Sequence, residues 1–148
     1  DMPLVADGPY LLLEDLGLEG TRAQLSYQDK SSSVKVIESL MAKRYDTFEC
    51  LEVKGAESWM YNTVYEIKAS VNTEKLVDML MRTSIFAKEP EQWTRILVEG
   101  LDAAFFQKSG PEYIAVKGNR FWYIIYGGPE TYSEDFDHTK VLEALAKL

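Results

Sequence analysis

The sequence predicts an α+β fold, a mainly antiparallel sheet of about six strands with helices packed on one face. Residues 61–71 alternate apolar and polar side chains, which is typical of a strand with one buried and one wet face. Strand-like segments come as neighbouring pairs joined by short turns, which favours antiparallel pairing. Segments with apolar residues three and four positions apart, typical of helices, separate these pairs. The predicted order is β-β-α-β-β-α-α-β-β-α.

The chain of 148 residues is expected to fold as a single domain over residues 1–148, with residues 1–8 as a loose lead-in. A chain of this length buries about 70% of the surface that its unfolded form exposes, so it needs no disulfide or metal to hold it. The single cysteine, Cys50, can form neither an internal disulfide nor a thiolate metal site alone.

The first half of the chain contains two predicted strand pairs on either side of a helix. Residues 10–14 and 21–27 are predicted as a hairpin, because 21–27 alternate cleanly and two glycines lie between them. After a serine-rich loop at 28–33, which supplies a helix N-cap, one apolar stripe predicts a helix: Val34, Ile37, Leu40, Met41 and Tyr45. Residues 47–53 and 61–71 form the second pair, and the odd-numbered side chains of 61–71 are expected to be buried under helices.

The second half is predicted to contain three helices. Residues 72–86 form the first, with Asn72 as its N-cap. The next begins near Pro90 and carries the stripe Trp93, Ile96, Leu97, Leu101, Ala104 and Phe105. Gly100 interrupts this stripe at a cost of about 1 kcal/mol relative to alanine, and its expected role is close packing against a neighbour. Residues 136–148 form the terminal helix, with one stripe of Val141, Leu142, Leu145 and Leu148.

A hairpin of unusual composition precedes the terminal helix. Gly118 and Asn119 form its predicted two-residue turn. Residues 121–126 after the turn are six bulky side chains in a row, with no charge among them. The turn sets the register of five pairs: Lys117–Arg120, Val116–Phe121, Ala115–Trp122, Ile114–Tyr123 and Tyr113–Ile124. Both faces of the hairpin are therefore apolar.

One face of this hairpin is the predicted binding surface, made of Tyr113, Trp122, Ile124 and Tyr126. Each predicted helix carries a single apolar stripe, which suits one covered face of one sheet. A dry aromatic patch on the other face is typical of an interface, and Trp122 would be its anchor. The alternatives are that helices or a second sheet cover both faces, which makes the hairpin the centre of the core, or that a strongly curved sheet wraps around itself.

The charge of the chain limits its partners. Its net charge is −8, from 24 acids and 16 bases, and its longest basic run is the pair Lys43–Arg44. Nucleic acids and anionic membrane surfaces both require clustered bases, so neither is an expected partner. No segment approaches the ~18 apolar residues of a membrane span, so no membrane insertion is expected. The first ten residues lack a signal peptide, and a start at Asp1 favours a trimmed or mature product. The nine tyrosines favour an exported protein.

No residue pattern predicts catalysis, a cofactor or a metal. The only histidine, His138, is expected on the surface of a helix-capping segment beside two acids. The acids of residues 133–137 lack the offsets of a calcium loop and suit a helix N-terminus. Acids on both sides of Cys50 would raise the pKa of its thiol, so a reactive thiolate is not expected. We therefore expect a protein that is not an enzyme.

The predicted function is that of a non-catalytic binding or protein-interaction domain, from an exported bacterial protein or its mature form. It would act through the aromatic sheet surface on a protein partner or in a homodimer. A first alternative is an acidic cytosolic adaptor, because the order α-β-β-α-β-β-α after residue 30, with the acidic composition, resembles the small acidic secretion chaperones. A second is an enzyme or small-ligand carrier with a pocket between sheet and helices.

Overall fold

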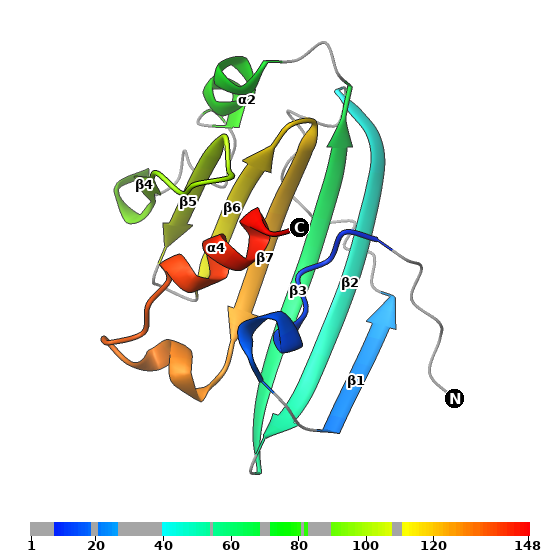
Figure 1. The fold of residues 1–148 in the computed structure, drawn as a ribbon, viewed down its shortest axis with the longest axis vertical. Helices are drawn as coiled ribbons and strands as arrows, with labels where there is room; N and C mark the ends of the chain where they lie inside the picture. Colours follow the sequence, from blue (N-terminus) through cyan, green and yellow to red (C-terminus); the bar gives the residue numbers. More distant parts are fainter. Residues whose placement is uncertain are drawn as a thin grey trace.

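The computed structural model describes residues 8–18, 21–26, 40–53, 55–68, 72–80, 82, 90–107 and 111–148. Within these ranges the chain forms one antiparallel sheet of seven strands, accompanied by short helices (Figure 1). The predicted α+β class and the antiparallel sheet are confirmed.

The strands are β1 (Thr21–Ser26), β2 (Met41–Val53), β3 (Ala56–Ile67), β4 (Thr94–Ile96), β5 (Ala103–Gln107), β6 (Glu112–Lys117) and β7 (Arg120–Gly127). Their order across the sheet is β1-β2-β3-β7-β6-β5-β4, and each neighbouring pair is antiparallel. The helices are α2 (Thr73–Leu80) and α4 (Thr139–Ala146), with the 3-10 helices η1 (Leu13–Leu16), η2 (Pro90–Gln92) and η3 (Pro129–Tyr132).

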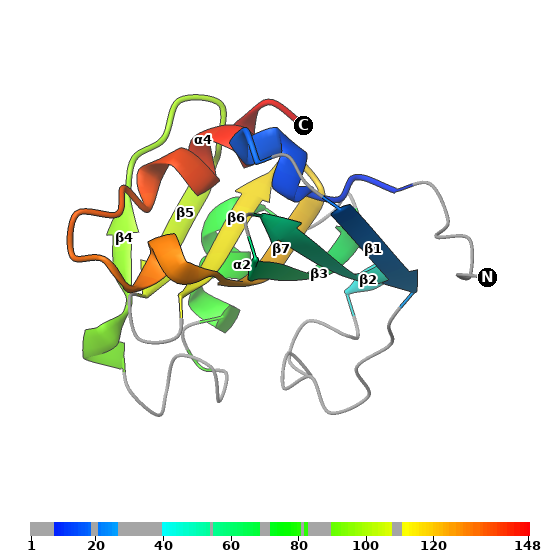
Figure 2. The ribbon, with the colours of Figure 1, turned by 90° about the horizontal axis from the view of Figure 1, so that it is seen from below.

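Each face of the sheet carries its own hydrophobic cluster. The first face is covered by α4 and by the N-terminal segment 8–16, here called the strap, which includes η1. On the second face α2 packs against one end of the sheet, over Tyr65, Phe121 and Val116. Figure 2 shows α4 and the blue strap on one side of the strands and α2 on the other. Helices thus lie on both faces, whereas the sequence predicts them on one.

The N-terminal region departs from the predicted hairpin of residues 10–14 with 21–27. β1 pairs with β2, with Ser26 opposite Thr47, and the strap lies over β3 on the first face (Figure 1). Side chains of the sheet take the backbone hydrogen bonds that a strand partner would have made. Asn62 binds both the N–H and the C=O of Leu11, each at 2.8 Å. The apolar run of residues 10–13 reflects packing of the strap on the sheet, not a place in it.

The predicted helix with the stripe from Val34 to Tyr45 is wrong over its second half. Residues 41–45 belong to β2, which pairs with β3 along its length, and residues 31–39 lie outside the described ranges. Side-chain contacts along β2 support the strand. Arg44 Nε lies 3.0 Å from Asp46 Oδ2, and Thr63 on β3 donates to the same carboxylate. The spacing of three and four that predicts a helix is coincidental in this segment.

The predicted helix from Pro90 to Phe105 is also wrong, because this segment forms η2, β4 and β5. Gly100 has a φ of +93°, in the left-handed region that favours glycine, so it makes a turn between the two strands. Leu97, placed on the predicted apolar stripe, is 100% exposed. The role of Gly100 is therefore conformational, although a side chain there would also lie 3.3 Å from Cβ of Ala146.

The aromatic hairpin has the predicted register, and all five residue pairs are present between β6 and β7. Gly118 has a φ of +61°, as the two-residue turn requires. The prediction for β3 is confirmed in part. Tyr65 and Ile67 are buried and Lys68 is exposed, but Tyr61 is only half-buried and the even-numbered Val64 is buried as well. Val64 is buried because the strap and α4 cover the first face, and Tyr65 and Ile67 are buried because α2 covers this end of the second face.

Two helix predictions are confirmed in their essentials. Asn72 caps α2, with its Oδ1 accepting the N–H of Lys75 at 2.8 Å, although the helix ends at Leu80 in the described part of the chain. The predicted stripe of the terminal helix α4 is buried at Val141, Leu142 and Leu145, whereas Leu148 lies beyond the helix and is exposed.

Candidate functional site

The four residues predicted as a binding surface lie in the core of the single chain. Tyr113, Trp122, Ile124 and Tyr126 are 0%, 0%, 0% and 1% exposed, under the strap and α4. The indole Nε1 of Trp122 donates to the carbonyl oxygen of Pro9 in the strap at 2.7 Å. The prediction that this face is left open is therefore wrong. The strap, predicted as part of the sheet, supplies the missing cover.

His138 is also in the core, at 7% exposed, so its predicted surface position is wrong. Its ring is stacked on Phe106, with 5.4 Å between ring centroids, and its Nδ1 lies 2.6 Å from the hydroxyl oxygen of Tyr113. Burial raises the pKa of Tyr113, so its hydroxyl stays protonated at neutral pH. His138 thus ties the start of α4 to β6, which is a structural role.

We expect His138→Ala to lower the free energy of unfolding by about 2 kcal/mol. The substitution removes one buried hydrogen bond and leaves the Tyr113 hydroxyl without this partner. Denaturant unfolding followed by circular dichroism measures the change, with Lys140→Ala on the exposed side of α4 as control. A loss below about 0.5 kcal/mol, the range of surface substitutions, would contradict the buried role.

Two other residues weighed for chemistry have the expected properties. Asp137 Oδ1 accepts the N–H of Thr139 at 3.0 Å, and hydrogen bonds from Thr139 lower the pKa of this exposed carboxyl. Asp137 thus serves the start of α4. Burial, aided by Glu57 and Glu52, raises the pKa of the Cys50 thiol on β2. Within the described ranges, no three His, Cys, Asp or Glu side chains lie close enough to hold a metal ion.

The second face of the sheet carries half-buried aromatic and apolar side chains beyond the end that α2 covers. We call this set the aromatic face: Phe48, Cys50, Trp59, Tyr61, Tyr123 and Ile125. Its rings form a contiguous row across β2 and β3. The centroids of Phe48 and Tyr61 are 4.6 Å apart, and those of Trp59 and Tyr61 are 5.6 Å apart. Partly exposed rings in contact are typical of interaction surfaces.

A glycine on the neighbouring strand fixes the orientation of the Trp59 ring. Gly127 on β7 pairs with Trp59, and a Cβ atom at Gly127 would lie 2.2 Å from Cζ2 of the indole. Only glycine therefore lets the ring lie flat across the strand. This face was not predicted from the sequence, because the predicted surface came from the hairpin alone. The odd-numbered positions 59, 61, 123 and 125, all bulky, are the signal that could have found it.

Carboxylates lie at two edges of the aromatic face. Glu52 and Glu57 are exposed and lie opposite each other at one end of the β2–β3 pair. Glu112 lies beside Ile125, accepts a hydrogen bond from the Tyr123 hydroxyl, and has its pKa raised by burial. Among the described residues that border these rings, Glu52, Glu57 and Glu112 are thus acidic.

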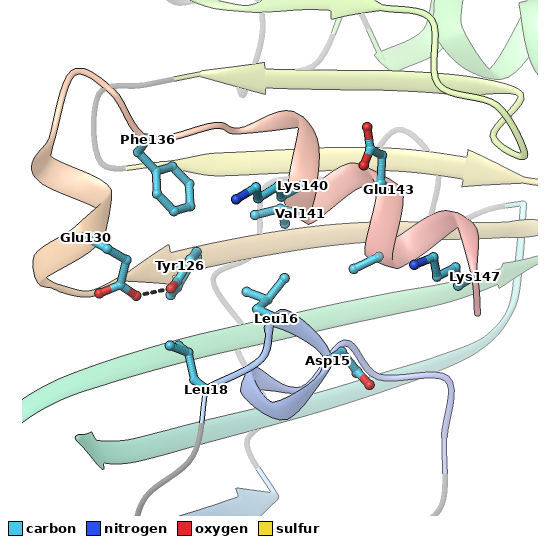
Figure 3. A pocket seen from close by; sticks show the side chains of 11 residues that line it. Asp15, Leu16, Leu18, Tyr126, Glu130, Phe136, Lys140, Val141, Glu143 and Lys147 are labelled. Carbon is cyan, nitrogen blue, oxygen red and sulfur yellow. Dashed lines mark hydrogen bonds between the residues drawn. The ribbon is translucent and has the colours of Figure 1, made fainter.

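A cavity of about 310 Å³ lies on the first face, between η1, η3 and α4 and above Tyr126 of β7 (Figure 3). Its apolar lining consists of Leu16, Leu18, Phe136, Val141 and Ala144. Its charged lining residues are Glu130 in η3, Asp15 in η1, Lys140 and Glu143 in α4, and Lys147 just after α4. This position, between sheet and helices, is the one expected for the pocket of a small-ligand carrier.

Similarity to known proteins does not indicate the class of this protein. Comparison of the chain with protein-family models, curated proteins and solved structures finds no match. Among the helices that the structure describes, none has the length and apolar character needed to cross a membrane.

Proposed function

We propose that this chain is a non-catalytic binding module that acts through the aromatic face of its sheet on a polypeptide partner rich in basic side chains. The observation that carries the proposal is the row of half-buried rings formed by Phe48, Tyr61 and Trp59, with the Trp59 ring lying against Gly127. This replaces the surface proposed from the sequence with the opposite face of the same sheet.

Charge selects the partner. The acids Glu52 and Glu57 border the rings, and the chain carries a net charge of −8. A second copy packed on this face would bring the same acids toward each other, which disfavours a homodimer here. Arginine side chains of a partner can make two kinds of favourable contact here, because guanidinium groups stack on Trp and Tyr rings and pair with carboxylates. The acidic field also speeds the encounter with a basic partner.

The adaptor alternative was based on an element order and on acidic composition. The structure alters that order, because strands β2, β4 and β5 occupy positions in 41–45 and 94–105 where helices were predicted. The small-ligand alternative keeps a specific observation, the cavity on the first face, and is argued separately below.

We expect Trp59→Ala to weaken binding of a basic peptide by at least about tenfold, because a central aromatic anchor carries a large share of interface energy. The probe is a short synthetic peptide that alternates arginine and valine. Binding is measured by calorimetry, and backbone amide NMR shifts locate the site. The shifts are expected around Phe48, Trp59 and Tyr61.

Three comparisons make this test specific. A matched peptide with glutamate in place of arginine is expected not to bind, and Glu57→Gln should reduce affinity for the arginine peptide. Tyr132→Ala removes a ring that is 76% exposed outside the aromatic face and should leave affinity unchanged. Equal binding of the two peptides, or shifts confined to the first face, would contradict the proposal.

A further inference from the structure

The cavity on the first face has a fixed carboxylate at one end. The Tyr126 hydroxyl donates to Oε1 of Glu130, and Ser58 Oγ lies 3.4 Å from the same oxygen. Burial, with the adjoining carboxylate, raises the pKa of Tyr126, so the hydroxyl stays a donor. Glu130 lines the cavity, and Figure 3 shows the carboxylate oxygen nearest the other lining residues bonded to Tyr126.

Gly128 lies against this carboxylate and leaves room for it. A Cβ atom at Gly128 would lie 2.8 Å from Oε1 and 3.0 Å from Oε2 of Glu130, so glycine leaves the space that the carboxylate fills. Two hydroxyls and this space hold Glu130 in one position. A carboxylate that is already ordered loses little conformational entropy when it binds a further group.

The remaining walls of the cavity suit a flat apolar body. Figure 3 shows Phe136 and Tyr126 on either side of the end nearest Glu130, with Leu16 and Leu18 on the wall opposite α4. The rings of Tyr126 and Phe136 meet edge to face, with centroids 6.0 Å apart. Aromatic rings beside a carboxylate form a combination that favours an organic cation.

The charged residues around the cavity favour a cation over an anion. The lining includes three acids, Asp15, Glu130 and Glu143, and two bases, Lys140 and Lys147. Glu130 is half-buried and held by other side chains, whereas the other four charged residues of the lining are exposed, two acids and two bases. We propose that this cavity binds a small aromatic or aliphatic amine, with its ammonium group on the carboxylate of Glu130 and its apolar body between Phe136, Leu16 and Val141.

The test uses three small molecules with the same ring and different charge: tryptamine, 3-ethylindole and indole-3-propionate. Calorimetry on the full chain is expected to show tryptamine binding at least about tenfold tighter than either of the others, with amide NMR shifts at Leu16, Phe136 and Val141. Glu130→Gln keeps an acceptor for Tyr126 but removes the charge. It should lower tryptamine affinity about tenfold and leave 3-ethylindole affinity unchanged.

Two further variants serve as controls. Ala144→Phe fills the cavity from α4 and should abolish binding of all three molecules. This variant tests the cavity independently, should Glu130→Gln fail to fold. Lys140→Ala should leave tryptamine affinity unchanged or raised. Tighter binding of indole-3-propionate that Lys140→Ala weakens would overturn the proposal in favour of an anion site, and no binding of tryptamine would overturn it outright. Trp59→Ala, on the other face, should not alter tryptamine binding, which separates this site from the aromatic face.

Discussion

Trp122→Ala is expected to lower the free energy of unfolding by about 4 kcal/mol, the typical cost of truncating a fully buried large aromatic side chain. Trp122 is 0% exposed and lies between Val64 and Ala115 on the neighbouring strands. Its loss leaves a cavity beneath the strap and removes the hydrogen bond from its indole to Pro9. The variant should therefore melt far below the parent protein.

The same substitution on the opposite face is the matched control. Trp59→Ala removes a half-exposed indole from the aromatic face, and it should cost less than half as much stability. Denaturant unfolding at several protein concentrations measures both variants. The loss for Trp122→Ala should not depend on concentration, since its cover comes from its own chain. A stable Trp122→Ala monomer with weakened self-association would instead restore the interface role that the sequence suggests.

Local patterns predicted those parts of the fold that depend on neighbours in the sequence. Gly118 and Asn119 set the register of the β6–β7 hairpin, because a two-residue turn leaves one way to pair the strands. Asn72 and the apolar stripe of α4 likewise act within one or two turns of helix. These features need no knowledge of the rest of the chain.

The errors come from contacts across long sequence distances. Spacings of three and four occur in β2 and around β4, but pairing with β3 and β5 overrides them, and Gly100 turns the chain with a positive φ. The strap resembles a strand in composition, yet its partners are side chains, not a strand. The strap covers Trp122. A prediction that places the strap within the sheet therefore leaves this core face uncovered and makes it an interface. It also hid the aromatic face on the opposite side.

Asn62→Ala is expected to lower the free energy of unfolding by about 3 kcal/mol. Asn62 is 1% exposed, and its amide satisfies both backbone groups of Leu11 across 51 positions of the chain. Alanine leaves that N–H and C=O buried without these partners, each at a cost of about 1–3 kcal/mol. Asn72→Ala, which removes only an exposed helix cap, is the matched control and should cost about 1 kcal/mol.

Hydrogen exchange distinguishes opening of the strap alone from unfolding of the whole sheet. Opening of the strap alone should speed exchange at the amides of Leu11 and Leu13, whereas those of β3 and β7 stay protected. Because the strap covers Trp122, its opening should also shift tryptophan emission to longer wavelength, and the same shift should be absent in Asn72→Ala. Unchanged exchange at Leu11 in a variant as stable as the parent would show that Asn62 does not hold the strap. In that case packing of Leu11 and Leu13 on the first face is what keeps it closed.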